Sequence, residues 1–221
     1  YALGDDIPSA VDHSDIAIIN IPPKRKTVNP VEFTQKMTQL CDHLFHAGTK
    51  QLLFISTTSV FGDQTGVIHE ATPPKPTTES GNAHTAIEAH LMEHYPRQTS
   101  ILRLSGLIGG ERHPAKSLAG KTGMKLPHHP VNLVHRNDVI QTIQAIIHKN
   151  AWGQTFLLSA TDHPTKQDYY VWAATQLGLT PPAFEAAEQP QSPKVIDCQS
   201  TLNQLEIQLA FPSPYDMLPL V

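Results

Sequence analysis

The sequence lacks the long apolar runs and the excess of basic charge that would indicate a membrane or a nucleic acid as its partner. Lysine and arginine number 16 against 20 acidic residues, and the formal net charge is -4. No run approaches the roughly 18 apolar residues of a membrane span, and no charged-then-apolar signal segment opens the chain. We therefore expect a cytoplasmic globular protein that binds neither nucleic acid nor membrane.

Cysteine is scarce, and its placement excludes a disulfide framework or a thiolate zinc site. Cys41 and Cys198 lie far apart in the sequence and neither belongs to a C-x-x-C pair, so both are predicted to be reduced thiols, although a disulfide between them stays open. The 13 histidines include one helical pair, His43 and His46, but no carboxylate or thiolate completes a tetrahedral set at a recognisable spacing. We predict no metal site.

Glycine-rich phosphate-binding turns are also absent. The sequence contains neither G-x-G-x-x-G nor G-x-x-G-x-x-G, the turns that hold a dinucleotide pyrophosphate after the first strand of a doubly wound sheet. The chain opens on Tyr1 and soon reaches a strong strand pattern, DIAIINIPP from Asp15, which would expose a flat apolar edge if no strand covered it. We expect that N-terminal strands of the fold precede this sequence.

What the sequence does contain is an alternation of buried strands and amphipathic helices. Strand patterns are found at 15–21, 51–57, 99–108 and 153–160. Helical spacing is found at 30–47, 79–95 and 137–148. The first strand is expected in a sheet interior, because both of its faces are apolar. Strands that alternate with helices predict right-handed crossovers and an α/β fold, a Rossmann-type doubly wound parallel sheet.

The pattern changes after Ala160. Thr165 and Asp168 form a capping-box pair for a helix that should end near Gly178, and a proline-rich stretch, a short strand and a short helix follow. We divide the chain into a nucleotide-binding domain at 1–160 and a small C-terminal α+β substrate lobe at 161–221, to which 110–136 contributes.

Five segments, taken in order, carry a resemblance to a known superfamily. They are STTSVFG from Ser56, HEATPPKPTT from His69, SGNAHTAIEAHL from Ser80, ILRLSGLIGGER from Ile101 and PVNLVHRNDVIQTI from Pro130. This combination resembles the extended short-chain dehydrogenase/reductase superfamily, the NAD(P)-dependent epimerases and dehydratases. The resemblance implies NAD or NADP as cofactor, without distinguishing the two, and a small-molecule substrate of unknown identity. It also implies a monomer, or a homodimer formed through the helices at 30–47 and 79–95.

The resemblance further implies a set of site residues. In this superfamily a Ser or Thr three residues before the Val of the V-Y/F-G signature hydrogen-bonds the reacting oxygen, which assigns that role to Thr57 and places Thr58 beside the substrate. The residues against the cofactor would be Ile21, Pro22, Ser56, Thr57, Gly106, Leu107 and Ile108. A hydroxyl at this place can instead cap the backbone at the strand end.

The usual Tyr-x-x-x-Lys pair of the superfamily is replaced here. Counting back from Glu88, those positions hold Ser80 and His84. A serine hydroxyl cannot pass a proton near neutral pH without a base, which His84 would provide from one helical turn away, unless His84 hydrogen-bonds the nicotinamide ribose instead. The alternative is that Ser80 is a polar first-turn residue and that His84 faces solvent. Atypical members of the superfamily with P-x-x-x-S-G at this place show the same departure.

A second departure concerns the substrate. Sugar-nucleotide epimerases carry, three residues after the strand arginine, an Asn that contacts the substrate phosphate, and counting from Arg103 gives Gly106 here. Arg112 and Arg136 remain as candidate anion clamps in substrate binding, or as partners in surface ion pairs. Arg103 itself is a candidate partner of Asp138.

Two functions follow from these observations. The first is an NAD(P)-dependent, epimerase/dehydratase-like oxidoreductase in which Thr57 orients the substrate oxygen and a donor other than tyrosine, His84 or a bound water, handles the proton. The second is a catalytically inactive dinucleotide-binding protein that serves as a sensor or regulatory subunit. The fold alone cannot choose between them.

Overall fold

The computed structural model describes residues 3–4, 7, 11–23, 29–186 and 193–218. The chain forms two compact units that interleave along the sequence. Unit 1 comprises Tyr1–Asp63, Ala71–Leu104 and His148–Phe156, and unit 2 comprises Gln64–Glu70, Ser105–Ile147 and Leu157–Val221. Each unit has its own hydrophobic core. The predicted division at residue 160 stays a prediction.

The helices and strands predicted from the sequence are all present. The helices are α1 (Pro30–His46), α2 (Glu79–His94), α3 (Pro114–Leu118), α4 (Arg136–His148), α5 (Lys166–Gln176) and α6 (Gln199–Leu205), with 3-10 turns η2 (Thr58–Phe61) and η3 (Pro214–Asp216). The strands are β1 (Ile16–Ile19), β2 (Gln51–Thr57), β3 (Gly66–Ile68), β4 (Thr99–Leu104), β5 (Gly106–Ile108), β6 (Leu133–His135), β7 (Thr155–Leu158) and β8 (Lys194–Ile196). The short elements β3, α3 and β6 were not predicted.

The central sheet has the strand order β1-β2-β4-β7. β2 pairs in parallel with both β1 and β4, so the carboxyl ends of these three strands lie at one edge of the sheet. At this edge Thr57, the last residue of β2, is paired with Leu104, the last residue of β4. The parallel sheet and the intervening helices make the protein an α/β fold of Rossmann type, as predicted.

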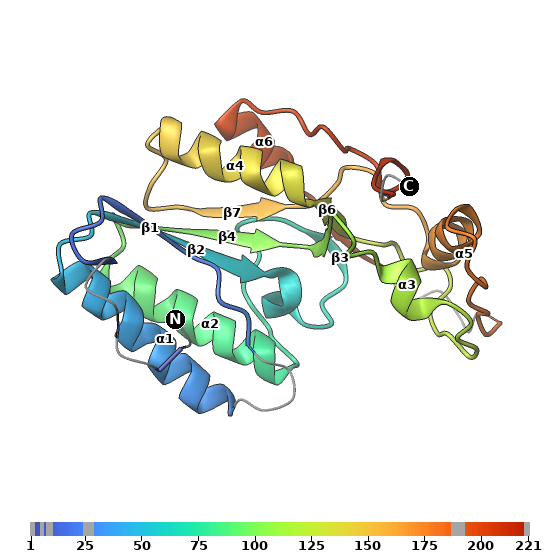
Figure 1. Ribbon diagram of the computed structural model, residues 1–221, viewed down its shortest axis with the longest axis horizontal. Coiled ribbons are helices and arrows are strands. Elements are labelled where there is room, and N and C mark those ends of the chain that lie inside the picture. The colour runs from blue at the N-terminus through green and yellow to red at the C-terminus, as the bar shows by residue number, and fades with distance from the viewer. Residues whose placement is uncertain (1–2, 5–6, 8–10, 24–28, 187–192, 219–221) are drawn as a thin grey trace. The chain divides into compact units, whose positions relative to one another are not determined.

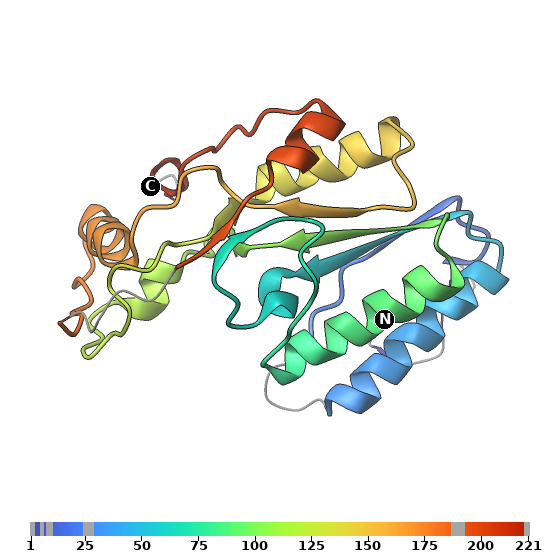
Figure 2. The ribbon, with the colours of Figure 1, turned by 180° about the vertical axis from the view of Figure 1, so that it is seen from behind.

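In unit 1 the helices α1 and α2 lie side by side along one face of β1, β2 and β4 (Figures 1 and 2). α1 begins where predicted, because the Asn29 side chain accepts a hydrogen bond from the Val31 amide and Pro30 occupies the first turn. Its apolar face buries Phe33, Met37, Leu40, Cys41 and Leu44 in the core of unit 1.

β1 lies at the edge of the sheet that the described residues form, where it pairs only with β2. The predicted place of this strand in a sheet interior stays a prediction. Ile16 and Ile18 are 36% and 45% exposed, whereas Ile19 points to the helices and is 7% exposed. The reason is that α1 and α2 both cover the same face of the sheet, so the apolar residues on the other face of β1 have no cover from them.

The predicted strand at 99–108 is in fact two strands. β4 belongs to the central sheet, and β5 pairs in parallel with β6 in a separate two-stranded sheet of unit 2. Ser105, between them, donates its amide to the carbonyl of Leu158. Sequence periodicity could not show this break, because both halves are apolar and the change of partner leaves no mark in the pattern.

Unit 2 also contains the parallel pair β3 and β8, and the helices α3 and α5, which pack together. α5 begins with the predicted capping pair: Thr165 Oγ1 accepts from the Asp168 amide at 3.1 Å and donates to Asp168 Oδ2 at 2.7 Å. Cys41 in unit 1 and Cys198 in unit 2 are both free and buried, and burial raises the pKa of the Cys41 thiol to about 12. Among the described helices, none combines the length and the apolar character needed to cross a membrane.

Candidate functional site

The candidate site in unit 1 starts where β2 ends. Thr57 Oγ1 accepts a hydrogen bond from the Ser59 amide at 3.1 Å and lies 3.0 Å from Ser59 Oγ, so the hydroxyl caps the turn η2. If the Ser59 hydroxyl is the donor in the second contact, the Thr57 proton stays available for an oxygen outside the protein. The capping role and the predicted role at a substrate oxygen are therefore compatible.

The glycine of the V-F-G signature closes this turn. Gly62 has a φ of +52°, and a Cβ placed on it would lie 2.2 Å from the carbonyl oxygen of Lys75. The Lys75 amide in turn donates to the carbonyl of Val60 at 2.9 Å. The segment after residue 71 thus packs directly on the backbone of η2, and only glycine permits this approach.

A buried ion pair lies beside the turn. Arg103 on β4 donates through Nη2 to Glu88 Oε2 on α2 at 2.7 Å and through Nε to both carboxylate oxygens at 3.2 Å. Ser56 Oγ donates to Glu88 Oε1 at 2.5 Å. The Arg103 guanidinium also lies over the ring of Phe61, 5.1 Å from its centroid.

This pairing shows that the predicted partnership of Arg103 with Asp138 was wrong. Asp138 belongs to unit 2, where its carboxylate accepts hydrogen bonds from the amides of Ala210 and Phe211 at 2.7 and 3.2 Å. Glu88 lies on the face of α2 that is turned to β4, and it supplies both oxygens to the guanidinium, which is the strongest geometry for such a pair.

Ser80 lies in the first turn of α2 and is half-buried. The helix begins with Thr78, whose hydroxyl accepts from the Gly81 amide at 3.1 Å. A Cβ on Gly81 would lie 2.6 Å from the carbonyl oxygen of Ser59. The Ser-Gly pair of the sequence therefore brings the start of α2 into backbone contact with the turn that carries Thr57.

His84 is buried, so the alternative in which it faces solvent was wrong. It is 6% exposed and lies between the rings of Phe33 and Phe54, with centroids 6.1 and 5.9 Å away. Its Nδ1 donates to the backbone carbonyl of Ser80 at 2.8 Å, because a carbonyl can only accept. The hydrogen bond between the two residues thus involves the Ser80 carbonyl rather than its hydroxyl, and in the neutral imidazole it leaves Nε2 as an acceptor.

The remaining predicted site residues of unit 1 lie at the same edge of the sheet. Ile21 and Pro22 follow the carboxyl end of β1 and are half-buried and exposed, respectively. Thr58 opens η2 directly after Thr57 and is half-buried. Together with Ser56 and Thr57 these residues follow or end two adjacent parallel strands.

The other predicted residues belong to unit 2. Gly106, Leu107 and Ile108 form β5, which runs from the exposed Gly106 to the buried Ile108. A Cβ on Gly106 would lie 2.8 Å from Leu133 Cδ2 and 3.2 Å from the carbonyl oxygen of Asn132, so a side chain here would require Leu133 to shift. Arg112 is exposed and closes a tight turn with Gly109 through two backbone hydrogen bonds of 3.2 and 3.3 Å.

Two comparisons of the sequence identify the family. The model of the NAD dependent epimerase/dehydratase family matches residues 23–124. Protein YeeZ of Escherichia coli (strain K12) is 33% identical over 213 residues, which are 96% of this chain and 77% of that protein. This chain belongs to the NAD-dependent epimerase/dehydratase family.

Solved structures of this fold agree with the assignment. A functionally unknown conserved protein from Silicibacter pomeroyi has a TM-score of 0.77 at 23% identity, with 97% of this chain and 79% of that chain covered. UDP-glucuronic acid 4-epimerase from Bacillus cereus, solved in complex with NAD, has a TM-score of 0.74 at 16% identity, with 92% and 71% covered. At these identities the likeness concerns the fold.

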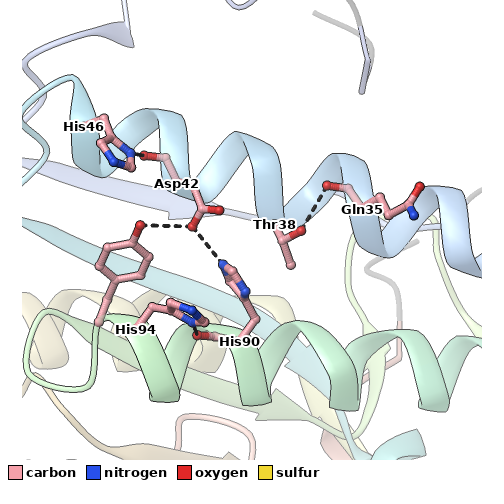
Figure 3. A network of polar contacts seen from close by, with 7 residues as sticks. Gln35, Thr38, Asp42, His46, His90 and His94 are labelled. Carbon is pink, nitrogen blue, oxygen red and sulfur yellow. Dashed lines mark hydrogen bonds and ion pairs between the residues drawn. The ribbon is translucent and has the colours of Figure 1, made fainter.

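Sequence reasoning missed one polar network in this family member. Asp42 on α1 accepts hydrogen bonds from His90 Nε2 at 2.8 Å and from the Tyr95 hydroxyl at 3.0 Å, and so joins α1 to the end of α2 (Figure 3). The ring of His94 stacks on that of His90. Burial and the bond to Asp42 raise the pKa of Tyr95 to about 12. Nowhere in the described part of the chain do three or more His, Cys, Asp or Glu side chains form a group that could hold a metal ion.

Proposed function

We propose that this protein is an NAD(P)-binding oxidoreductase of the epimerase/dehydratase type, in which Thr57 orients an oxygen of a small-molecule substrate. The observation that carries the proposal is the position of Thr57. Its hydroxyl stands at the carboxyl edge of a parallel sheet, where ligands of open α/β folds bind, on a turn held by a buried ion pair. A hydroxyl with a proton to share suits the polarisation of a carbonyl or alcohol oxygen.

The residues of unit 1 fit the nicotinamide end of such a cofactor. A bound NAD or NADP supplies or accepts a hydride, and the fold family implies that it lies across the carboxyl edge of the sheet. In the proposal Ile21 and Pro22 after β1 and Ser56 and Thr57 at the end of β2 line that edge. For unit 2 the family resemblance implies Gly106, Leu107 and Ile108 as cofactor-binding residues; these form β5, and Gly106 is exposed.

Proton handling differs from that of the family's Tyr-x-x-x-Lys pair. The imidazole of His84 is held on the Ser80 carbonyl, which fixes its tautomer and also the first turn of α2. We assign to His84 the support of that turn, and to Ser80 a hydroxyl that can bind a water or the substrate beside Thr57. Thr57 then hydrogen-bonds the substrate oxygen and a bound water handles the proton, a weaker acid–base arrangement than a tyrosine with a lowered pKa.

The proposed substrate carries an anionic group but is not a nucleoside-diphosphate sugar. Gly106 cannot make the contact to the substrate phosphate that the epimerases make with asparagine. Arg112 and Arg136 flank the turn at Gly109 in unit 2, and neither has an ion-pair partner among the residues that the structure describes. Guanidinium groups of this kind bind carboxylates or phosphates, and we give Arg112 this role.

The burial of His84 favours a second candidate function. A side chain that is 6% exposed and lies between two phenylalanine rings is poorly placed to exchange protons with a substrate. In this second candidate the protein binds the dinucleotide without turning it over, and acts as a sensor or regulatory subunit. The difference between the candidates is turnover, since both require the nucleotide site.

A turnover screen separates the two functions. Wild-type protein, Thr57→Val and the control Thr34→Val are incubated with NADH or NAD and a panel of carboxylated carbonyl compounds, alcohols and UDP-sugars, and absorbance at 340 nm is followed. Thr34 is a half-buried threonine of α1 whose hydroxyl is bonded within its own helix. The oxidoreductase predicts turnover of a carboxylated compound and a loss of kcat/KM of about 10²-fold in Thr57→Val, the usual effect of removing one donor to the reacting oxygen. Binding without turnover across the panel would favour the sensor.

Assembly and location are part of the same proposal. A homodimer would use the exposed faces of α1 and α2, and light scattering of the purified protein distinguishes it from the monomer. The free and buried thiols of Cys41 and Cys198 suit the reducing cytoplasm that we propose as its compartment.

A further inference from the structure

The buried cluster of Ser56, Glu88 and Arg103 is more polar than stability requires. The three residues are only 4%, 4% and 6% exposed, and both carboxylate oxygens of Glu88 are occupied by donors. Taking two opposite charges out of water costs free energy that their attraction only partly returns, and well-packed apolar residues of the same size often stabilise a protein equally well. Stability alone therefore does not explain this cluster.

What distinguishes the cluster is the segment that it holds. Ser56 directly precedes Thr57, and its hydroxyl is fixed on Glu88. Arg103 lies against the ring of Phe61, the last residue of η2, which is fully buried. The cluster thus contacts both ends of the five-residue stretch from Thr57 to Phe61. Glu88 on α2 holds the residue before Thr57, and Arg103 on the adjacent strand β4 lies against Phe61.

We propose that Ser56, Glu88 and Arg103 are positioning residues that fix the direction of the Thr57 hydroxyl. Charge-assisted hydrogen bonds to a planar guanidinium are directional, whereas apolar contacts in the same space would allow the strand end to rotate. A rotation of the backbone at Ser56 would carry Thr57 away from the Ser59 amide, which its hydroxyl caps at 3.1 Å. The proposal rests on the proposed function for the use of Thr57, but its structural content is independent of any ligand.

The test replaces the charges without leaving a cavity or an orphan charge. The paired variant Glu88→Leu/Arg103→Met removes both partners at once and keeps the volume. The control, Glu32→Leu/Lys36→Met, removes an ion pair of the same 2.7 Å length from the surface of α1 in the same unit. Amide hydrogen exchange is measured for Ser59 and Gly62 in the turn and for Leu53 in β2, together with thermal unfolding and NADH binding.

The proposal predicts that the paired variant melts within a few degrees of wild type and keeps the protection of Leu53, while exchange at Ser59 and Gly62 rises at least tenfold. NADH, if wild type binds it, should bind the variant about threefold to tenfold more weakly. The control should change neither quantity. Unchanged exchange at Ser59 and Gly62 in a folded paired variant would overturn the proposal.

Two further outcomes remain decisive. If the paired variant does not fold, Ser56→Ala removes a single hydrogen bond from the cluster and should still raise exchange at Ser59 about threefold, and an unchanged rate there would overturn the proposal. If wild type binds neither NADH nor NADPH, the proposed function fails, whereas the exchange rates still report whether the cluster positions the turn.

Discussion

The family resemblance assigns catalytic roles to the positions of Thr57 and His84, and the surroundings of these two residues differ. The position of Thr57 at a strand end could be predicted from the sequence, because a strand end and the turn after it leave local patterns. Its role at a substrate oxygen comes from the family resemblance and stays a prediction. The burial of His84 could not be predicted, because exposure on a helix depends on which distant residues cover it. Here Phe33 and Phe54, from another helix and a strand, close over the imidazole.

At the residue scale, the burial of His113 in unit 2 predicts how the stability of the protein depends on pH. It is 4% exposed, its Nδ1 accepts from the Ala115 amide at the start of α3, and its Nε2 lies 3.0 Å from the hydroxyl of Tyr169. Burial lowers the pKa of His113 to about 4. Between about pH 6.5 and pH 4 the unfolded chain therefore binds a proton at this histidine and the folded protein does not. The free energy of unfolding falls as the pH is lowered through this range, by up to roughly 3 kcal/mol.

Urea unfolding at pH 7.5, 5.5 and 4.5 checks this contribution. His113→Asn, which keeps a capping side chain but does not titrate, should lose stability less steeply below pH 6.5 than wild type does. Burial also lowers the pKa values of His129 and His135, so these two residues steepen the loss of stability at falling pH in both wild type and His113→Asn. His148→Asn, at the exposed end of α4, should follow wild type. Parallel pH profiles for wild type and His113→Asn would refute the assignment.

At the scale of elements, the type and approximate bounds of the long segments could be read from the sequence, whereas their neighbours could not. The helix predicted at 79–95 is α2 at Glu79–His94, because the capping threonine and the spacing are local signals. The edge position of β1 and the break between β4 and β5 depend on pairing with distant strands, for which a single sequence contains no signal. The same limit applies to the contact between α2 and η2.

The contact between α2 and η2 predicts that an alanine substitution at a helical glycine destabilises the protein. Gly81→Ala normally stabilises a helix by about 1 kcal/mol, but here the new Cβ would lie 2.6 Å from the Ser59 carbonyl oxygen and 3.0 Å from Pro76 Cβ. We expect a loss of about 1–3 kcal/mol, the usual range for overpacking, measured by urea unfolding. Asn82→Ala, one residue on and exposed, should be neutral or stabilising. A Gly81→Ala protein as stable as wild type would mean that α2 and η2 do not touch in this way.

At the scale of the whole molecule, the α/β class, the parallel sheet and the family could be derived from the order of strands, helices and motifs. The interleaving of the two units could not, because segments such as Gln64–Glu70 are too short to show in composition which unit they join. The choice between NAD and NADP also remains beyond the sequence, because no residue that would select the ribose phosphate was recognised in it. We thus propose that this family member keeps a nucleotide site without the usual tyrosine and lysine.

Calorimetric titration of NADH and of NADPH into the purified protein is the decisive experiment. We predict a micromolar dissociation constant for at least one of the two, and at a hundredfold excess over that constant a stabilisation of about 2.7 kcal/mol against unfolding. A folded protein that binds neither nucleotide at millimolar concentration would contradict the account, and would leave the Rossmann-type fold without its expected ligand.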